Sequence, residues 1–151
     1  MSTDAPTTPA SAEAFALPDP DPRPDGERIA PWRVRAAIAY MQANMARPIS
    51  LAELAALADT SVFHFSRGFR NATGEPPLRH LTRLRIRKAC AMLAGTDLPV
   101  ARIAQKVGYR SPQAFSRAFE RLCGCTPRAH RNRCSKGVDL SHCCNDDLAS
   151  P

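Results

Sequence analysis

The sequence predicts an all-α fold in which two similar helical units are joined by one long helix. Three observations support this prediction. From residue 32 to residue 133, apolar side chains recur at helical spacing, and no segment alternates as a β-strand would. Motifs of the first half return about 50 residues later in the second half. Two stretches of different composition flank this helical part.

Both ends of the chain have the composition of disordered tails. Residues 1–31 hold seven of the 14 prolines and few large apolar side chains, so they cannot build a helix or a core. Residues 134–151 lack helical periodicity and carry an acidic run near their end. The predicted ordered domain is therefore 32–133.

The first unit, residues 32–76, is expected to begin with an amphipathic helix. Pro31 suits the first helical position, where the missing N–H costs nothing. The apolar face expected for this helix consists of Trp32, Ala36, Ile38, Ala39 and Met41.

Two more helices are expected in the first unit. Ser50 followed by Glu53 is a capping-box pattern, which predicts a helix start. Ser61 is the expected cap of the third helix. The Gly-Glu-Pro-Pro run at 74–77 ends it.

The linker helix is expected at 77–95, where an apolar stripe runs beside a dense arginine face and Gly95 marks the end. The second unit, residues 96–133, begins with another short helix. Gly108 suits a tight turn after it, and Ser111 is the expected cap of the last strong helix.

The two units share residue types at an offset of 50. The matched pairs are Ser61/Ser111, Phe65/Phe115, Ser66/Ser116, Arg67/Arg117, Phe69/Phe119, Gly74/Gly124, Pro77/Pro127 and His80/His130. Each half contains a short helix, a tight turn and a second helix, which is the pattern of a helix-turn-helix (homeodomain-like) subdomain. Phenylalanines four residues apart share one helix face, so we assign them to the core. We expect a packing role for the two histidines.

Two departures distinguish the first subdomain from the second. Asp59 occupies the turn position that Gly108 holds in the second copy, and aspartate tolerates positive φ less well than glycine. Gly68 lies inside a helix, where glycine costs about 1 kcal/mol relative to alanine. We therefore expect the second subdomain to be the better ordered of the two.

Charge is distributed very unevenly along the chain. The net charge is +7, but residues 28–136 carry twenty basic and five acidic side chains, whereas residues 1–27 carry one basic and six acidic ones. A basic domain of this kind favours a polyanionic partner, with nucleic acid first and an acidic membrane surface second.

The sequence disfavours several classes of protein, namely membrane proteins, secreted proteins and enzymes. No apolar run is long enough for a transmembrane helix, and no secretory signal is evident, so we expect a cytoplasmic protein with mostly reduced cysteines. Neither a phosphate-binding glycine loop nor a hydrolase or metalloprotease motif is present. The sequence thus predicts a protein that is not an enzyme and needs no cofactor.

The chain resembles the DNA-binding region of the AraC/XylS family of bacterial transcription regulators. The resemblance covers essentially all of 32–133 and is most specific in the second half. The segments that carry it are 49–55, 65–69, 80–93, 103–109, 115–119 and 124–131. It implies two helix-turn-helix subdomains, each placing one recognition helix in the major groove of double-stranded DNA.

The resemblance also implies which residues contact DNA. Base-facing positions would be Phe63, Ser66, Arg67, Pro112, Gln113, Ser116 and Arg117. The expected phosphate contacts are Arg70, Arg83, Arg87, Arg110 and Arg121. The chemistry suits these roles, because arginine can pair with guanine and glutamine with adenine. We expect a monomer on DNA in the bacterial nucleoid, with RNA polymerase as a protein partner.

Two other functions stay open at this point. A weakly specific architectural DNA-binding protein would also be strongly basic. A thiol- or metal-responsive switch would use the C-terminal cysteines, among them Cys123, Cys125, Cys143 and Cys144. The spacing of these cysteines does not match a zinc ribbon, so the sequence predicts no metal site.

Overall fold

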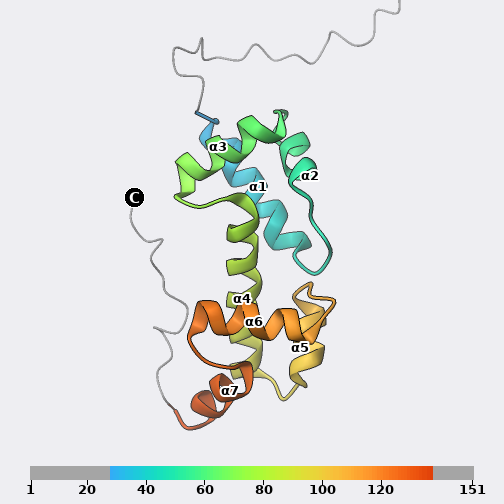
Figure 1. Ribbon diagram of the computed structural model, residues 1–151, viewed down its shortest axis with the longest axis vertical. Helices are drawn as coiled ribbons and strands as arrows, with labels where there is room; N and C mark the ends of the chain where they lie inside the picture. Colours follow the sequence, from blue (N-terminus) through green and yellow to red (C-terminus); the bar gives the residue numbers. More distant parts are fainter. Residues whose placement is uncertain (1–27, 138–151) are drawn as a thin grey trace, which may run out of the picture.

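The computed structural model describes residues 28–137, and within this range it contains seven α-helices and no strand. The helices are α1 (Pro31–Asn44), α2 (Leu51–Leu57), α3 (Val62–Thr73), α4 (Pro77–Gly95), α5 (Val100–Lys106), α6 (Pro112–Cys123) and α7 (Pro127–Ser135). Figure 1 shows α1–α3 at one end and α5–α7 at the other, with α4 running between them. The predicted all-α fold is confirmed.

The two helix-turn-helix units, α2–α3 and α5–α6, have the same dimensions. Their first helices are both 7 residues long, and their second helices are both 12 residues long. The predicted caps are confirmed, because the hydroxyls of Ser50, Ser61 and Ser111 each accept a hydrogen bond from a backbone N–H in the first turn. Gly74 and Gly124 end α3 and α6 in the left-handed conformation.

The turn inside each motif requires positive φ. Gly108 adopts a φ of 90°, and Asp59 adopts a φ of 49° at the equivalent position. Because Asp59 has a Cβ, its conformation costs roughly 1–2 kcal/mol, whereas Gly108 avoids this cost. The turn of the first motif therefore keeps the positive φ of the second, although aspartate suits this conformation less well than glycine.

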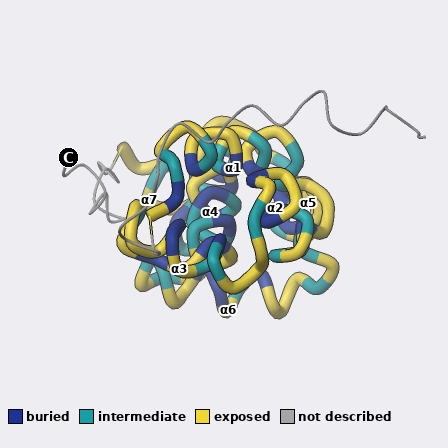
Figure 2. Tube along the Cα trace, turned by 90° about the horizontal axis from the view of Figure 1, so that it is seen from above, coloured by how far each residue is buried: buried dark blue, intermediate teal, exposed yellow. Residues whose placement is uncertain are grey.

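Two hydrophobic cores hold the molecule together, and α4 contributes to both. The first core contains Phe65 and Phe69, and the second contains Phe115 and Phe119, all with fully buried side chains. On α4, Leu81 and Leu84 belong to the first core, whereas Ile86, Ala89 and Leu93 belong to the second. Figure 2 shows these buried stretches gathered toward the centre. The linker helix is thus a part of both subdomains.

The face that α1 buries agrees only in part with the expected one, since Met41 is buried and Ile38 packs against the first core as predicted. Its buried residues are Val34, Ala37 and Met41, whereas Trp32 is 58% exposed. The helix is rich in alanine on several sides, so its sequence periodicity does not single out one face. Packing against α2, α3 and α4 selects the stripe through Val34.

Both predicted tails contain ordered residues. Ile29 lies within 1–31 but is buried in the first core, and α7 continues through Cys134 to Ser135. The rest of the predicted tails, residues 1–27 and 138–151, lies outside the described residues.

Ile29 explains the unusual glycine of α3. A Cβ at Gly68 would lie 2.8 Å from the Cβ of Ile29 and 3.2 Å from its backbone nitrogen. The absence of a side chain at Gly68 therefore lets the segment before α1 pack directly on α3. At the equivalent place in the second subdomain, Ala118 is accommodated in the core.

Candidate nucleic-acid interface

The outer face of α3 carries the base-facing residues that the sequence predicts for the first subdomain. Phe65 and Phe69 point into the core, which turns the opposite side of the helix toward solvent. Phe63 is 71% exposed, and the Arg67 guanidinium lies 5.5 Å from the centroid of its ring. Ser66 is half-buried and donates a 2.8 Å hydrogen bond to the Val62 carbonyl.

The outer face of α6 repeats this arrangement. Pro112, Gln113 and Arg117 are exposed, and Ser116 is half-buried like Ser66. The Ser111 hydroxyl donates a 3.0 Å hydrogen bond to the side-chain carbonyl of Gln113, which holds the carboxamide near the start of the helix. The structure therefore brings the predicted contacts of each subdomain together on one exposed helix face.

The predicted phosphate-contacting arginines have different surroundings. Arg70, Arg87, Arg110 and Arg121 are exposed. Arg83 is half-buried, and its guanidinium lies 3.4 Å from a carboxylate oxygen of Glu75. Arg83 thus contributes to the packing of the first subdomain, a role that the sequence pattern does not reveal.

Glu75 is a buried carboxylate in the turn just before α4. It is only 6% exposed, and its Oε1 lies 2.9 Å from the Nδ1 of His80 as well as near Arg83. The His80 ring packs edge-on against Phe69, with 5.5 Å between centroids. His130 packs in the same way against Phe119 at 5.4 Å, so the packing role expected for both histidines is confirmed.

A second ion-pair cluster joins α1 to α2. The carboxylate of Glu53 accepts hydrogen bonds from the Arg47 guanidinium and the Tyr40 hydroxyl. These bonds, chiefly that from Arg47, lower the pKa of Glu53 from 4.5 to about 2, and the bond from Tyr40 raises the pKa of that phenol. Sequence reasoning assigned Glu53 only to a capping box and missed this cluster, because Tyr40 and Arg47 lie outside α2 and helical periodicity does not connect them to Glu53.

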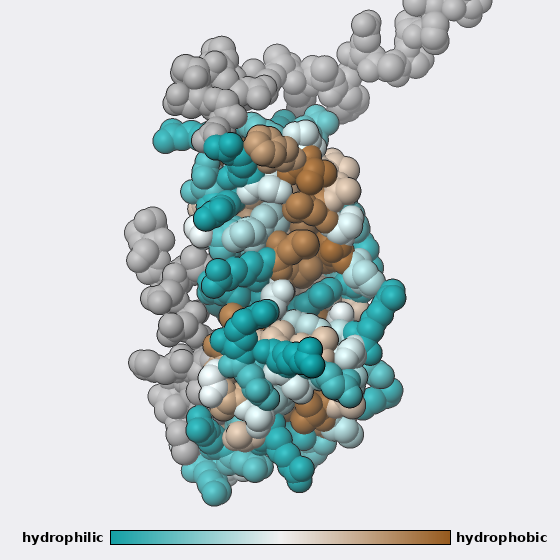
Figure 3. Space-filling model, viewed as in Figure 1, coloured by the Kyte–Doolittle hydropathy of each residue, from teal (hydrophilic) through white to brown (hydrophobic). Residues whose placement is uncertain are grey.

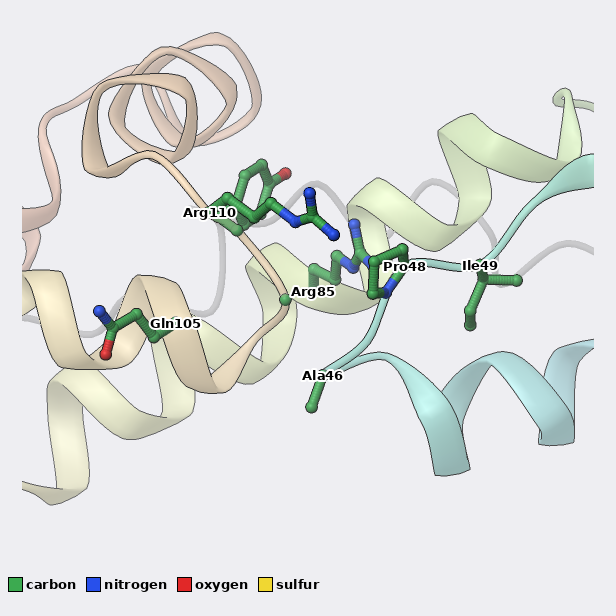
Figure 4. Close-up of a pocket in the computed structure, with 8 residues that line it drawn as sticks. Ala46, Pro48, Ile49, Arg85, Gln105 and Arg110 are labelled. Atoms are coloured by element: carbon green, nitrogen blue, oxygen red, sulfur yellow. The ribbon is translucent and has the colours of Figure 1, made fainter.

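A third polar contact lies where the two subdomains meet. Arg85 donates hydrogen bonds to the carbonyls of Met45 and Arg47 at 3.0 and 2.8 Å, and its guanidinium lies 5.7 Å from the centroid of the Tyr109 ring. Figure 4 shows its side chain in a groove between the loop at 46–49 and Arg110. Burial lowers the pKa of Arg85 below its ordinary value, although a guanidinium stays charged in proteins.

The cysteines form no recognisable metal site in the part of the chain that the structure describes. Within residues 28–137, no group of three or more histidine, cysteine or acidic side chains could hold a metal ion. Cys90 and Cys123 bring α4 and α6 into contact, with 3.8 Å between their sulfur atoms. Cys143 and Cys144, which the sequence hypothesis includes, lie outside the described residues.

The surface of the first subdomain is the more apolar one. Figure 3 shows apolar side chains gathered over the end that α1–α3 form, whereas hydrophilic residues predominate over the other end in this view. Trp32, Leu57, Val62 and Phe63 are exposed large apolar residues of these three helices. Among the described residues, no helix combines the length and the apolar character that crossing a membrane would require.

Two helix-turn-helix units with matching basic faces define a protein of the DNA-binding class. Comparison with known sequences narrows this class. A profile of the helix-turn-helix domain family matches residues 54–133, which is more than half of the chain. The chain belongs to the AraC/XylS family of transcription regulators, as its sequence resemblance implies.

Curated relatives are regulators of bacterial transcription. The MmsAB operon regulatory protein of Pseudomonas aeruginosa is 38% identical over 99 residues, which cover 66% of this chain and 32% of the relative. The RCS-specific HTH-type transcriptional activator RclR of Escherichia coli is 39% identical over 101 residues, covering 67% of this chain and 36% of the relative. The matched segment thus spans about a third of these relatives.

Solved structures with the same fold include DNA-binding domains. The DNA-binding domain of AdpA, in complex with a target DNA, has a TM-score of 0.66 and 30% identity, covering 71% of this chain and 98% of that one. The C-terminal domain of AraT, a response regulator from Geobacillus stearothermophilus, has a TM-score of 0.65 and 32% identity, and the match covers 70% of this chain and 87% of that one. The chain is therefore a DNA-binding domain of this family, and these relatives are transcription regulators rather than enzymes.

Proposed function

We propose that the protein is a sequence-specific transcription regulator that reads two successive major-groove segments with α3 and α6. The observation that carries this proposal is the match between the two helices. They are equal in length, bury the same phenylalanine pair, and expose arginine at the same position, Arg67 and Arg117. Such a match supports two equivalent recognition helices rather than one.

The dimensions of α4 support simultaneous reading. Its 19 residues correspond to about 28 Å of helix. Successive major grooves on one face of DNA lie about 34 Å apart. A linker of this length allows one chain to reach both segments, so we propose that the protein binds as a monomer.

Selection of bound sites from randomised DNA tests this function. We expect two separated sequence patterns, one for each recognition helix, and one protein per duplex by native mass spectrometry. A single pattern would contradict reading by both helices. Binding without any pattern, but with a steep salt dependence, would instead support the architectural alternative.

Regulation of transcription requires a consequence for RNA polymerase, and we propose direct contact as the route. The relative RclR is a transcriptional activator, which supports an activating contact. Transcription in vitro from a promoter that carries the selected site tests this step. We expect the product to increase when the protein is added, whereas lower or unchanged output would contradict activation.

A further inference from the structure

The position of Arg85 on α4 separates the two cores. Leu84, immediately before it, packs in the first core, and Ile86, immediately after it, packs in the second. A helix that joins two bodies can bend gently along its length, with a radius of roughly 60–100 Å. The linker helix by itself therefore leaves the angle between the two subdomains partly adjustable.

Arg85 links both subdomains at this position. Its Nε and one terminal nitrogen donate to the carbonyls of Met45 and Arg47, at the end of α1 and in the following loop. A cation at the C-terminal end of a helix is also favoured by the helix dipole. The guanidinium faces Tyr109 of the second subdomain at 5.7 Å, so one side chain contacts both bodies.

Gly108 brings the second subdomain close enough for this contact. A Cβ at Gly108 would collide with the carbonyl oxygen of Met45 and would lie 2.9 Å from a terminal nitrogen of Arg85. The equivalent turn residue of the first subdomain, Asp59, carries a side chain and is exposed. Gly108 therefore serves the contact between subdomains in addition to its own turn.

We propose that the Arg85 junction, formed by Arg85, Gly108, Tyr109, Met45 and Arg47, fixes the orientation of α3 relative to α6 and thereby selects the spacing between the two half-sites. In this proposal Arg85 is a positioning residue that specifies spacing without reading a base. The junction lies beside the axis of α4, so it resists bending and twisting that the helix alone would permit. The inference rests on the proposed reading of DNA by both helices.

Binding to DNA of variable spacing tests the proposal. The duplexes carry the two selected half-sites with one or two base pairs inserted or removed between them. Each added base pair moves one half-site by about 3.4 Å and turns it by about 34°. We expect the parent protein to lose about tenfold in affinity when the spacing changes by one base pair, comparable to one lost base contact.

Two variants of Arg85 separate positioning from charge. Arg85→Ala removes the junction and the charge, whereas Arg85→Lys keeps the charge but lacks the planar fork that reaches two carbonyls. We expect both to bind the best spacing more weakly and to show less than about threefold dependence on spacing, with unchanged base preferences inside each half-site. Arg35→Ala, which removes an exposed charge of α1, should keep the full dependence of the parent.

Residual dipolar couplings of the free protein provide a readout that is independent of DNA. In the parent protein, both subdomains should fit one alignment tensor, and in Arg85→Lys they should require two. Equal loss of affinity at every spacing, or one shared tensor in both variants, would overturn the proposed junction. Failure of the parent protein to select two half-sites would overturn the proposed function instead, and the couplings would still decide the role of Arg85.

Discussion

At the residue scale, the predicted base-facing residues of the two recognition helices are alike at some positions and different at others. Arg67 and Arg117 are equivalent, whereas Phe63 in α3 is replaced by Gln113 in α6. Arginine suits guanine, glutamine suits adenine, and an aromatic edge suits a thymine methyl group. We therefore expect the two half-sites to share a guanine position and to differ at a neighbouring base.

Replacement of Arg117 by alanine tests one base contact. We expect Arg117→Ala to cost about 1–3 kcal/mol on the selected site and to relax preference at one base position of the second half-site. Arg67→Ala is the matched variant and should relax the base preference at one position of the first half-site only. Competition binding against each single-base substitution measures both effects. An equal loss on unrelated DNA would show that Arg117 contacts phosphate.

Glu53 predicts a specific acid dependence of stability. Its pKa is lowered to about 2 in the folded protein, so its bonds to Arg47 and Tyr40 stabilise the fold above pH 4.5 and are lost as the pH falls toward 2. Glu53→Gln should flatten the dependence of unfolding free energy on pH in this window. Urea unfolding at several pH values measures it. An unchanged slope in Glu53→Gln, with Glu120→Gln as the control, would contradict this assignment.

At the element scale, the caps and the paired phenylalanines follow from local sequence, because a cap depends on residues within one turn and a core face on helical period. The buried face of α1 does not follow from local sequence, because its alanines make several faces nearly equally apolar. The roles of Arg85 and Gly68 also depend on distant partners, Met45 and Ile29. From the sequence alone, Gly68 is only a cost to the helix, and its packing role becomes visible through its contact with Ile29 in the structure.

Packing of Ile29 on α3 predicts that Gly68→Ala changes the stability in opposite directions in the parent protein and in an Ile29→Gly variant. Gly68→Ala should destabilise the protein by about 1–3 kcal/mol, because the new methyl group collides with Ile29. In an Ile29→Gly background, the same change should stabilise by up to about 1 kcal/mol through helix propensity. Thermal unfolding compares the four proteins. Stabilisation of the parent by Gly68→Ala would contradict the close contact.

At the scale of the whole molecule, charge is segregated between the basic domain and the preceding residues. The described domain carries most of the basic side chains, whereas residues 1–27 carry six acidic ones. Such a segment can compete with DNA for a basic surface at low ionic strength, where screening is weak.

Deletion of residues 1–27 tests this competition. We expect the shortened protein to bind DNA more tightly at low salt and to equal the parent at high salt. A full-length variant with the six acidic residues replaced by their amides should behave like the deletion. Identical affinities at every salt concentration would contradict competition and would assign these residues to solubility.

The participation of α4 in both cores makes the two halves unequal as fragments. A fragment that begins at residue 77 keeps the whole of α4 and with it every helical partner of the second core. A fragment that stops at residue 76 loses His80, Leu81 and Leu84, and these three side chains complete the first hydrophobic core. The carboxy-terminal half should therefore be able to fold by itself, whereas the amino-terminal half depends on a helix made after it. During synthesis, the first subdomain must wait until α4 has left the ribosome.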